Sequence, residues 1–456
     1  MKLKFFTVLL YSMLLVFLSS CIGDKTPINA DLDNDLTKSI IRAAEDNTLS
    51  YYILPSETDL GNIPQDTINN PLNQAKVDLG KFLFFDTGIA QDALFDSGVG
   101  TYSCATCHLP EAGFKPGNFQ GIADGGLGFG INGEDRVMNY DDYKESDLDV
   151  QSARPLSLLN VAYVNNTFWS GQFGATHENE GTEDVWGLLD HSTELNHMGM
   201  QGLETQNMEG MTVHRMRVDR EIADEYGYTA LFDEAFPELA GQDTLYTNTY
   251  ASFALSAYIR TLLANKAPFQ DWLKGNSNAM TTDEKEGAIL FFNKANCSRC
   301  HYKPNLGSLE FHALGVKDMY QLDYFDAHPE DLRNIGRAGF TNNPEDNYKF
   351  KVPGIYNIDN INDQKFLFHG ASKTSVRDLL EYKNEAVSEN PNVSNDILSD
   401  KFEPLYLTDS EIDKLEAFLV NGLRDPDLKR YEPLEVPSGK CFPNADPESI
   451  RDLGCN

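Results

Sequence analysis

The sequence predicts a mainly α-helical protein made of two similar domains with long irregular loops, and three observations lead to this fold class. Apolar residues recur every three or four positions in several segments, which is the period of an amphipathic helix. An apolar segment followed by a short cysteine motif occurs twice, once in each half of the chain. Alternation of apolar and polar residues, which would indicate strands, is scarce.

The first segment, residues 1–20, has the features of a bacterial export signal. Two early lysines precede an apolar run from Phe5 to Leu18, and Leu18-Ser19-Ser20-Cys21 is typical of a lipoprotein cleavage box. The apolar run is short for a membrane-spanning helix, which is the alternative. We therefore expect a periplasmic or outer-membrane-anchored lipoprotein, attached to the membrane only through a lipid on Cys21.

The rest of the chain divides into four stretches. Residues 21–70 are polar and rich in Asp and Asn, which predicts a tether with only Ser39–Ala44 helical. Residues 71–265 and 266–430 each contain one copy of the repeated pattern and form the two expected domains. Residues 431–456 are irregular, and we expect them to wrap the second domain as a strap.

Three helices are predicted most clearly. They cover Tyr250–Leu263, Asp283–Phe292 and Asp409–Leu419, and the last follows a Thr408-Asp409 capping signal. Seven glycines within Gly117–Gly133 predict a loop.

The net charge of -33 restricts the partners of the protein. It argues against nucleic acid, because phosphates would be repelled, and it would attract a basic partner protein. The alternative, that acidity only keeps the protein in solution, stays open.

The repeated pattern carries the chemistry. Gly80–Phe85 precedes Cys104-Ala105-Thr106-Cys107-His108, and Gly287–Phe292 precedes Cys297-Ser298-Arg299-Cys300-His301. Two cysteines three positions apart lie on one face of a helical turn, so both sulfurs can bond the vinyl groups of one porphyrin, and the next histidine can ligate its iron. The sequence therefore predicts two covalently bound haem c groups.

These cysteines have two alternative uses, a single zinc site formed by all four thiols or a redox dithiol in each pair. The distance between the pairs along the chain and the histidine after each pair favour haem. Cys441 and Cys455 predict a disulfide in an oxidising compartment, with two free thiols as the alternative.

In order and spacing, five segments resemble the bacterial di-haem cytochrome c peroxidase and MauG family. They are Leu79-Gly80-Lys81-Phe82-Leu83-Phe84-Phe85-Asp86, Ser103-Cys104-Ala105-Thr106-Cys107-His108, Asn160-Val161-Ala162-Tyr163, Phe168-Trp169-Ser170-Gly171 and Phe350-Lys351-Val352-Pro353-Gly354-Ile355-Tyr356-Asn357. The resemblance implies two cytochrome-c-like helical domains with one haem each. Trp169 matches the tryptophan that lies between the two haems in the family.

The resemblance also implies a division of labour, with hydrogen peroxide reacting at the N-terminal haem and the C-terminal haem relaying electrons. Breaking the O–O bond needs a group that transfers a proton, so we expect a carboxylate near the peroxide. Glu194 matches the family's glutamate, and Asp184 stands where the family has a glutamine, which puts the role of Asp184 in doubt. A capping or solvated carboxylate is the alternative for Glu194.

Peroxidases of this family that need prior reduction block the N-terminal haem with a histidine shortly after the haem motif. This chain has no histidine from residue 109 to 176. We therefore expect an accessible peroxide haem, unless His177, His191, His197 or His214 folds back onto it.

The second haem lacks the methionine ligand that the family's peroxidases use, since no methionine follows Met319. After Phe366–Gly370, the predicted helix Ser375–Tyr382 places Tyr382 within one residue of the ligand position. MauG-like members use tyrosine there, and an anionic oxygen ligand stabilises ferric iron. The alternatives are that Tyr382 is an ordinary helix residue or that Lys383 is the ligand.

A calcium ion, which the family commonly holds between its domains, stays an open question. The matching segments, Ala153-Arg154-Pro155 and Asn362–Phe366, are altered here. We expect His312 and His328 to be surface residues.

Three functions are consistent with these sequence features. The first is a peroxidase supplied with electrons by a small periplasmic cytochrome c or cupredoxin. The second is a MauG-like oxidase that uses peroxide to oxidise side chains of a protein substrate through Trp169. The third is an electron-transfer protein without catalysis.

Overall fold

The computed structural model describes residues 30–322, 324–358 and 366–455, and this part of the chain is mainly helical. Its only strands form two short antiparallel pairs. β1 (Gly126–Leu127) pairs with β2 (Val137–Met138), and β3 (Phe311–His312) pairs with β4 (Phe350–Lys351). The predicted mainly α class is confirmed. The export signal and Cys21 lie outside the described residues.

One pair of crossed helices organises the first half of the chain. α3 (Gln74–Phe85) begins where the Asn73 side chain accepts a hydrogen bond from the Lys76 backbone N–H, and it packs against α7 (Asn248–Arg260). The crossing is close because Gly80 faces the other backbone. A Cβ atom at Gly80 would lie 1.9 Å from the Ala254 carbonyl oxygen.

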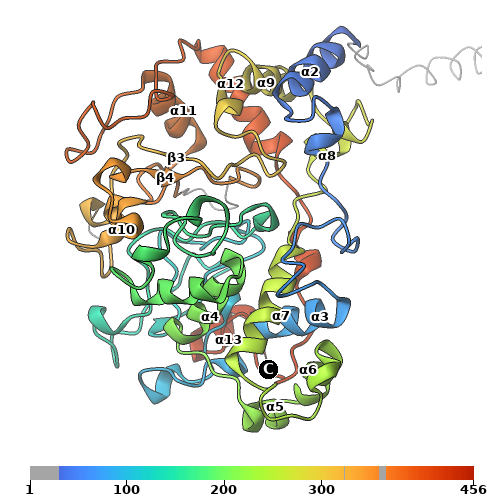
Figure 1. Cartoon of the computed structure of the whole chain (residues 1–456), viewed down its shortest axis with the longest axis vertical. Coiled ribbons are helices and arrows are strands. Elements are labelled where there is room, and N and C mark those ends of the chain that lie inside the picture. Colours follow the sequence, from blue (N-terminus) through green and yellow to red (C-terminus); the bar gives the residue numbers. More distant parts are fainter. Residues whose placement is uncertain (1–29, 323, 359–365, 456) are drawn as a thin grey trace, which may run out of the picture.

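The second half repeats this arrangement. α9 (Thr282–Phe292) crosses α12 (Asp409–Ala417), and a Cβ atom at Gly287 would lie 2.0 Å from the Lys414 carbonyl oxygen. Figure 1 shows the α3–α7 pair and the α9–α12 pair at opposite ends of the molecule. The glycines that begin the two repeats in the sequence therefore have the same structural job, which is to let the two helices of each pair approach.

Shorter helices and loops fill the space between the two pairs. Both cysteine motifs form a single 3-10 turn, at Cys104–Thr106 and Cys297–Arg299. The other helices are α4 (Gly202–Val213), α5 (Arg220–Glu225), α6 (Thr229–Ala235), α8 (Pro268–Leu273), α10 (Ala338–Thr341), α11 (Val376–Glu385) and α13 (Pro447–Leu453). None of the helices in the described ranges is long and apolar enough to cross a membrane.

The expected tether is wrong from residue 30 onward. Helix α2 (Ala30–Ala43) packs against α9, and Leu36 and Ile40 are fully buried. The Asp33 carboxylate accepts a hydrogen bond from the Trp272 indole N–H (2.8 Å) and pairs with Lys285 (2.7 Å). The polar composition of this stretch belongs to the exposed face of an amphipathic helix, and a buried apolar stripe lies on its other side.

The C-terminal segment also differs from the expectation, because it packs on the first half of the chain. The Ser103 hydroxyl donates to the Pro443 carbonyl (2.8 Å), and Arg136 forms a buried ion pair with Asp446 (3.2 Å). The segment ends in α13, which contacts β1. The predicted Cys441–Cys455 disulfide is present.

Candidate haem sites

The first cysteine motif lines a cavity of about 300 Å³. Cys104, Cys107 and His108 all face it, and the His108 Nδ1 lies 2.9 Å from the Phe114 carbonyl oxygen. Since a carbonyl only accepts, Nδ1 carries the proton and Nε2 is left with a lone pair, which is how proteins prepare a histidine for a metal. Burial lowers the pKa of His108 to about 4, so the imidazole is neutral.

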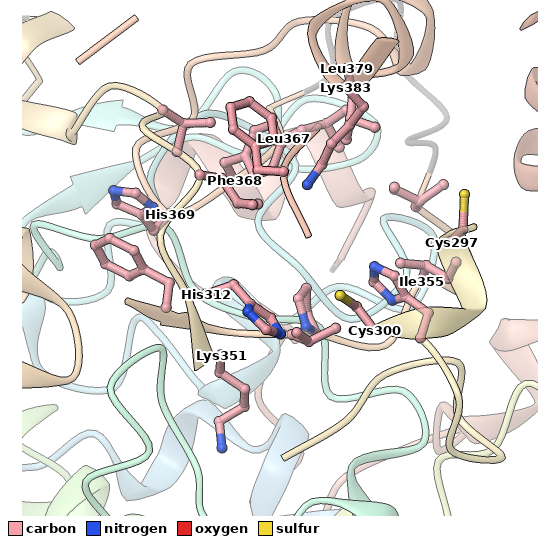
Figure 2. Close-up of a pocket in the computed structure, with 18 of the residues that line it drawn as sticks. Cys297, Cys300, His312, Lys351, Ile355, Leu367, Phe368, His369, Leu379 and Lys383 are labelled. Carbon is pink, nitrogen blue, oxygen red and sulfur yellow. The ribbon is translucent and has the colours of Figure 1, made fainter. Parts of the chain in front are cut away.

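The second motif lines a separate cavity of about 240 Å³ in the same way. Cys297, Cys300 and His301 face it, and the His301 Nδ1 lies 2.8 Å from the Leu306 carbonyl oxygen. Burial again lowers the histidine pKa to about 4. Figure 2 shows Cys297 and Cys300 on one side of this cavity, with Lys383 projecting into it from the helix above.

The thiols themselves argue against the two alternatives considered from the sequence. All four are unpaired, and burial raises the pKa of Cys104, Cys107 and Cys297 to about 12, whereas a redox dithiol needs a lowered pKa. The two pairs line different cavities, so they do not converge on one zinc ion. Two thiols beside an oriented, neutral imidazole in an apolar cavity fit a haem c group.

Trp169 lies in the wall that the two cavities share. Its indole N–H donates to the Arg154 carbonyl (2.7 Å), and its own carbonyl accepts from the Lys351 N–H (2.8 Å). The rings of Phe350 and His369 contact it at centroid distances of 6.5 and 6.0 Å. The indole is therefore held between the two sites, where the resemblance places the family's tryptophan.

Two buried cations belong to the same wall. The Arg154 guanidinium donates to the carbonyls of Pro116 (3.0 Å), Asn118 (2.5 Å) and Phe119 (2.8 Å), and burial lowers its pKa to about 9. Burial lowers the pKa of Lys351 to about 7, and its ammonium donates to the Asn166 carbonyl. Arg154 belongs to one of the two segments that match the family's calcium site. Of the other segment, Asn362–Phe366, only Phe366 is among the described residues.

The two carboxylates predicted for the peroxide site lie outside the first cavity. Glu194 is 55% exposed and pairs with His191 at 3.2 Å, and Asp184 is exposed on a 3-10 turn. The cavity is instead lined by Asp149, Asp190 and Glu209, among other residues.

Glu209, which the sequence did not suggest, has the properties of a proton-transferring group. It lies on α4, and burial together with the nearby charge of Asp190 raises its pKa. Asp190 is fixed by hydrogen bonds from the Gln172 amide (2.8 Å) and the Ser192 hydroxyl (2.7 Å). No sequence pattern singled out Glu209, because α4 buries polar and apolar side chains alike and so has no clear polar face.

Of the four histidines considered as blocking ligands, His214 alone lines the first cavity. Its Nδ1 lies 2.8 Å from the buried Asp149 carboxylate. Burial opposes protonation of this imidazole, but the Asp149 charge holds the pKa of His214 above its ordinary value. His177, His191 and His197 are exposed.

At the second cavity the structure separates the two neighbours Tyr382 and Lys383. The Tyr382 hydroxyl donates to the Leu314 carbonyl (2.5 Å), and Tyr382 does not line the cavity, whereas Lys383 does. Burial lowers the pKa of Lys383 to about 8.

The two histidines expected at the surface differ from each other. His328 is exposed, as expected, but His312 lines the second cavity. Its Nε2 pairs with Glu310 (2.8 Å) and its Nδ1 contacts the Ser399 hydroxyl (3.0 Å). The polar sequence around His312 reflects these partners and not exposure to solvent.

Known proteins resemble this chain in sequence. Residues 74–278 match the model of the di-haem cytochrome c peroxidase family. The cytochrome-c peroxidase IdrP1 of Denitromonas iodatirespirans is 26% identical over 383 residues, covering 79% of this chain and 85% of that protein. The methylamine utilization protein MauG of Methylorubrum extorquens is 25% identical over 358 residues, covering 78% and 80%.

A solved structure shares the fold. It is that of a MauG-like protein associated with microbial copper homeostasis, which matches with a TM-score of 0.54 and 22% identity over 82% of this chain and 95% of that one. With two cavities of this kind, the chain is an oxidoreductase of the peroxidase type and resembles the di-haem members of that class. More particularly, it is a relative of the bacterial di-haem cytochrome c peroxidases and MauG proteins, and the resemblance found in the sequence is confirmed.

Proposed function

We propose that this protein reduces hydrogen peroxide at the first cavity with electrons relayed through the second. The observation that carries the proposal is the pair of cavities, each lined by two thiols and an oriented histidine, with Trp169 in the wall between them. When bound through Cys104, Cys107 and His108, and through Cys297, Cys300 and His301, two haem c groups supply the redox-active irons.

The side chains around the first cavity provide the proton chemistry. Burial, and then the neighbouring charge of Asp190, raises the pKa of Glu209 and so favours its protonated form. The Glu209 carboxylate can take a proton from one oxygen of hydrogen peroxide and give that proton to the leaving oxygen. Gln172 holds Asp190 in place. Trp169 supplies an aromatic ring between the cavities through which an electron can pass.

Sequence features support a proposal for the location and the partners of the protein. Its export signal and Cys21 support an exported lipoprotein, and its net charge of -33 supports a basic electron donor such as a small cytochrome c.

The proposal is tested on full-length protein made in a host that attaches haem c. Mass spectrometry is expected to show the added mass of two haems, and peroxide is expected to shift a high-spin haem band of the oxidised protein. Reduced cytochrome c should be oxidised in steady state when peroxide is present. Two low-spin haems that do not respond to peroxide would instead identify an electron-transfer protein.

Glu209→Gln and Glu194→Gln form a matched pair that locates the proton-transferring group. We expect Glu209→Gln to lower kcat for peroxide reduction by about 100-fold, as loss of a general acid–base group does. Glu194→Gln should stay close to the parent because its carboxylate is in solvent. The opposite result would return the role to Glu194.

A MauG-like reaction is the second candidate, favoured by one observation. No methionine is among the described residues that line the second cavity, so a thioether ligand is not offered there. Such an enzyme would use peroxide to oxidise aromatic side chains of a partner protein. It would show little turnover with reduced cytochrome c, and mass spectrometry would detect oxygen insertion or cross-links in the partner.

A further inference from the structure

The wall of the second cavity supplied by α11 presents an amine to the cavity that His301 also lines. Leu379, Leu380 and Lys383 line this wall, and the two leucines precede Lys383 by four and three positions, which puts them on its face of the helix. Figure 2 shows the Lys383 amine pointing into the open cavity, with Cys297 and Cys300 on the neighbouring side. Tyr382, one position earlier, is rotated by about 100° around the helix and points elsewhere.

Apolar and aromatic groups surround the Lys383 side chain. The Phe368 and Phe402 rings lie 5.9 and 5.5 Å from its nitrogen. Within the described ranges, no carboxylate or carbonyl forms an ion pair or a hydrogen bond with this amine. Burying an amine in an apolar cavity is costly unless its nitrogen finds a partner, and a metal ion can be that partner.

The other amines and imidazoles of this cavity already have partners. His312 uses both ring nitrogens, the His369 Nε2–H donates to the Asp318 carboxylate (2.9 Å), and the Lys351 amine points away from the cavity in Figure 2. Lys401 pairs with Glu310 (2.6 Å), and Lys115 donates to the Asn357 carbonyl (2.7 Å).

The oxygen donors are less suited. The Tyr382 hydroxyl is bound to the Leu314 carbonyl, and its ring packs against Phe402 outside the cavity. Tyr348 lines the cavity too, but burial raises the pKa of its phenol, which opposes a phenolate ligand.

We propose that the Lys383 amine is the second axial ligand of the haem iron held by His301. The proposal rests on the di-haem function proposed above. The second haem then has two nitrogen ligands, a histidine and a lysine, in place of the phenolate that Tyr382 would give. A nitrogen ligand also lacks the thioether sulfur that raises the reduction potential of cytochrome c-type haems.

The test uses the full-length, haem-loaded protein and three variants, Lys383→Ala, Lys383→Met and Tyr382→Phe. Electron paramagnetic resonance and near-infrared magnetic circular dichroism of the oxidised parent should show one low-spin haem with two nitrogen ligands. In Lys383→Ala we expect that signal to be lost, with one haem equivalent turning high-spin, and added imidazole to restore a low-spin signal.

The two remaining variants separate ligation from packing. Lys383→Met should restore a low-spin haem with a thioether signature and a higher reduction potential, while Tyr382→Phe should leave the parent spectrum unchanged. Mass spectrometry of each variant checks that both haems are attached. A parent-like spectrum in Lys383→Ala with two attached haems, or loss of the low-spin signal in Tyr382→Phe, would overturn the assignment of Lys383 and leave the di-haem function standing. Failure of the parent to bind haem would overturn the function itself.

Discussion

At the scale of single residues, Glu432 shows how burial couples a carboxyl group to pH. Burial, and then the charge of Glu111, raises the pKa of Glu432 to about 7. This pKa lies above the value in the unfolded chain. The contribution of Glu432 to the free energy of unfolding is therefore largest at low pH and is lost as the pH rises from about 4.5 to 7.

We therefore expect Glu432→Gln, which stays neutral, to be more stable than the parent above pH 7. The free energy of unfolding should rise by about 1–2 kcal/mol, which is less than the full pKa shift implies because solvent screens a partly buried side chain. The difference should vanish near pH 4.5. Urea unfolding at pH 5 and pH 8 measures this difference. Exposed Glu435→Gln is the control, and an equal gain in both variants would contradict the prediction.

The thiols and the histidine that line one side of each cavity could be predicted from the sequence, and the residues that line the other side could not. The Cys-x-x-Cys-His motif is local, so its chemistry is visible in five consecutive letters. Glu209 and Lys383 depend on which way a helix faces, and an error of one position rotates a side chain by about 100°. Tyr382 and Lys383 differ by that one position.

At the scale of elements, the two helix crossings depend on their glycines. Adding a methyl group at Gly80 or Gly287 would place a carbon about 2 Å from a carbonyl oxygen of the partner helix. We expect Gly80→Ala and Gly287→Ala each to lower the free energy of unfolding by about 3 kcal/mol, because the helices must move apart.

Gly61→Ala is the matched control for these variants. No atom lies within 4 Å of a Cβ at Gly61, so the change should be within about 0.5 kcal/mol. Urea unfolding of the three variants makes the comparison. Parent-like stability of Gly80→Ala and Gly287→Ala would show that the crossings tolerate a side chain.

The predicted helices agree with the structure where an apolar stripe and a cap occur together. Asp283–Phe292 and Asp409–Leu419 correspond to α9 and α12, and Thr281 and Thr408 cap them through Glu284 and Glu411. Helix α2 was mostly missed because only its buried stripe is apolar, and the partner that buries this stripe, α9, lies far away in the chain. Such long-range packing leaves little local signal.

At the scale of the whole molecule, the Arg154 side chain bridges several backbone carbonyls in the wall between the two cavities. Its guanidinium already satisfies the carbonyls of Pro116, Asn118 and Phe119. We expect a chelator such as EDTA to leave the activity and the melting temperature unchanged. Arg154→Ala should destabilise the protein by about 3 kcal/mol, since buried acceptors lose their donors.

Exposed Arg451→Ala is the control for the loss of a positive charge. Activity and thermal melting are measured before and after chelation. A loss of activity in EDTA that added calcium restores would show that the protein does need the ion.

The large negative charge of the molecule predicts how it meets an electron donor. With a net charge of -33, kcat/KM for a basic cytochrome c should fall by about 10-fold as ionic strength rises from about 10 to 150 mM. A small uncharged electron donor should show no such dependence in the same steady-state assay. Equal salt dependence for both donors would rule out electrostatic steering.

The way the C-terminal segment closes over the first cysteine motif has a consequence for biogenesis. Ser103 and Thr106, which flank and lie within the motif, hydrogen-bond Pro443 and Asn444, which lie 340 and 338 positions further along the chain. The surroundings of the first motif are therefore complete only after this distant segment has been synthesised and has docked. If porphyrin is joined to Cys104 and Cys107 as proposed, the attaching enzyme would reach the motif more easily before this segment docks.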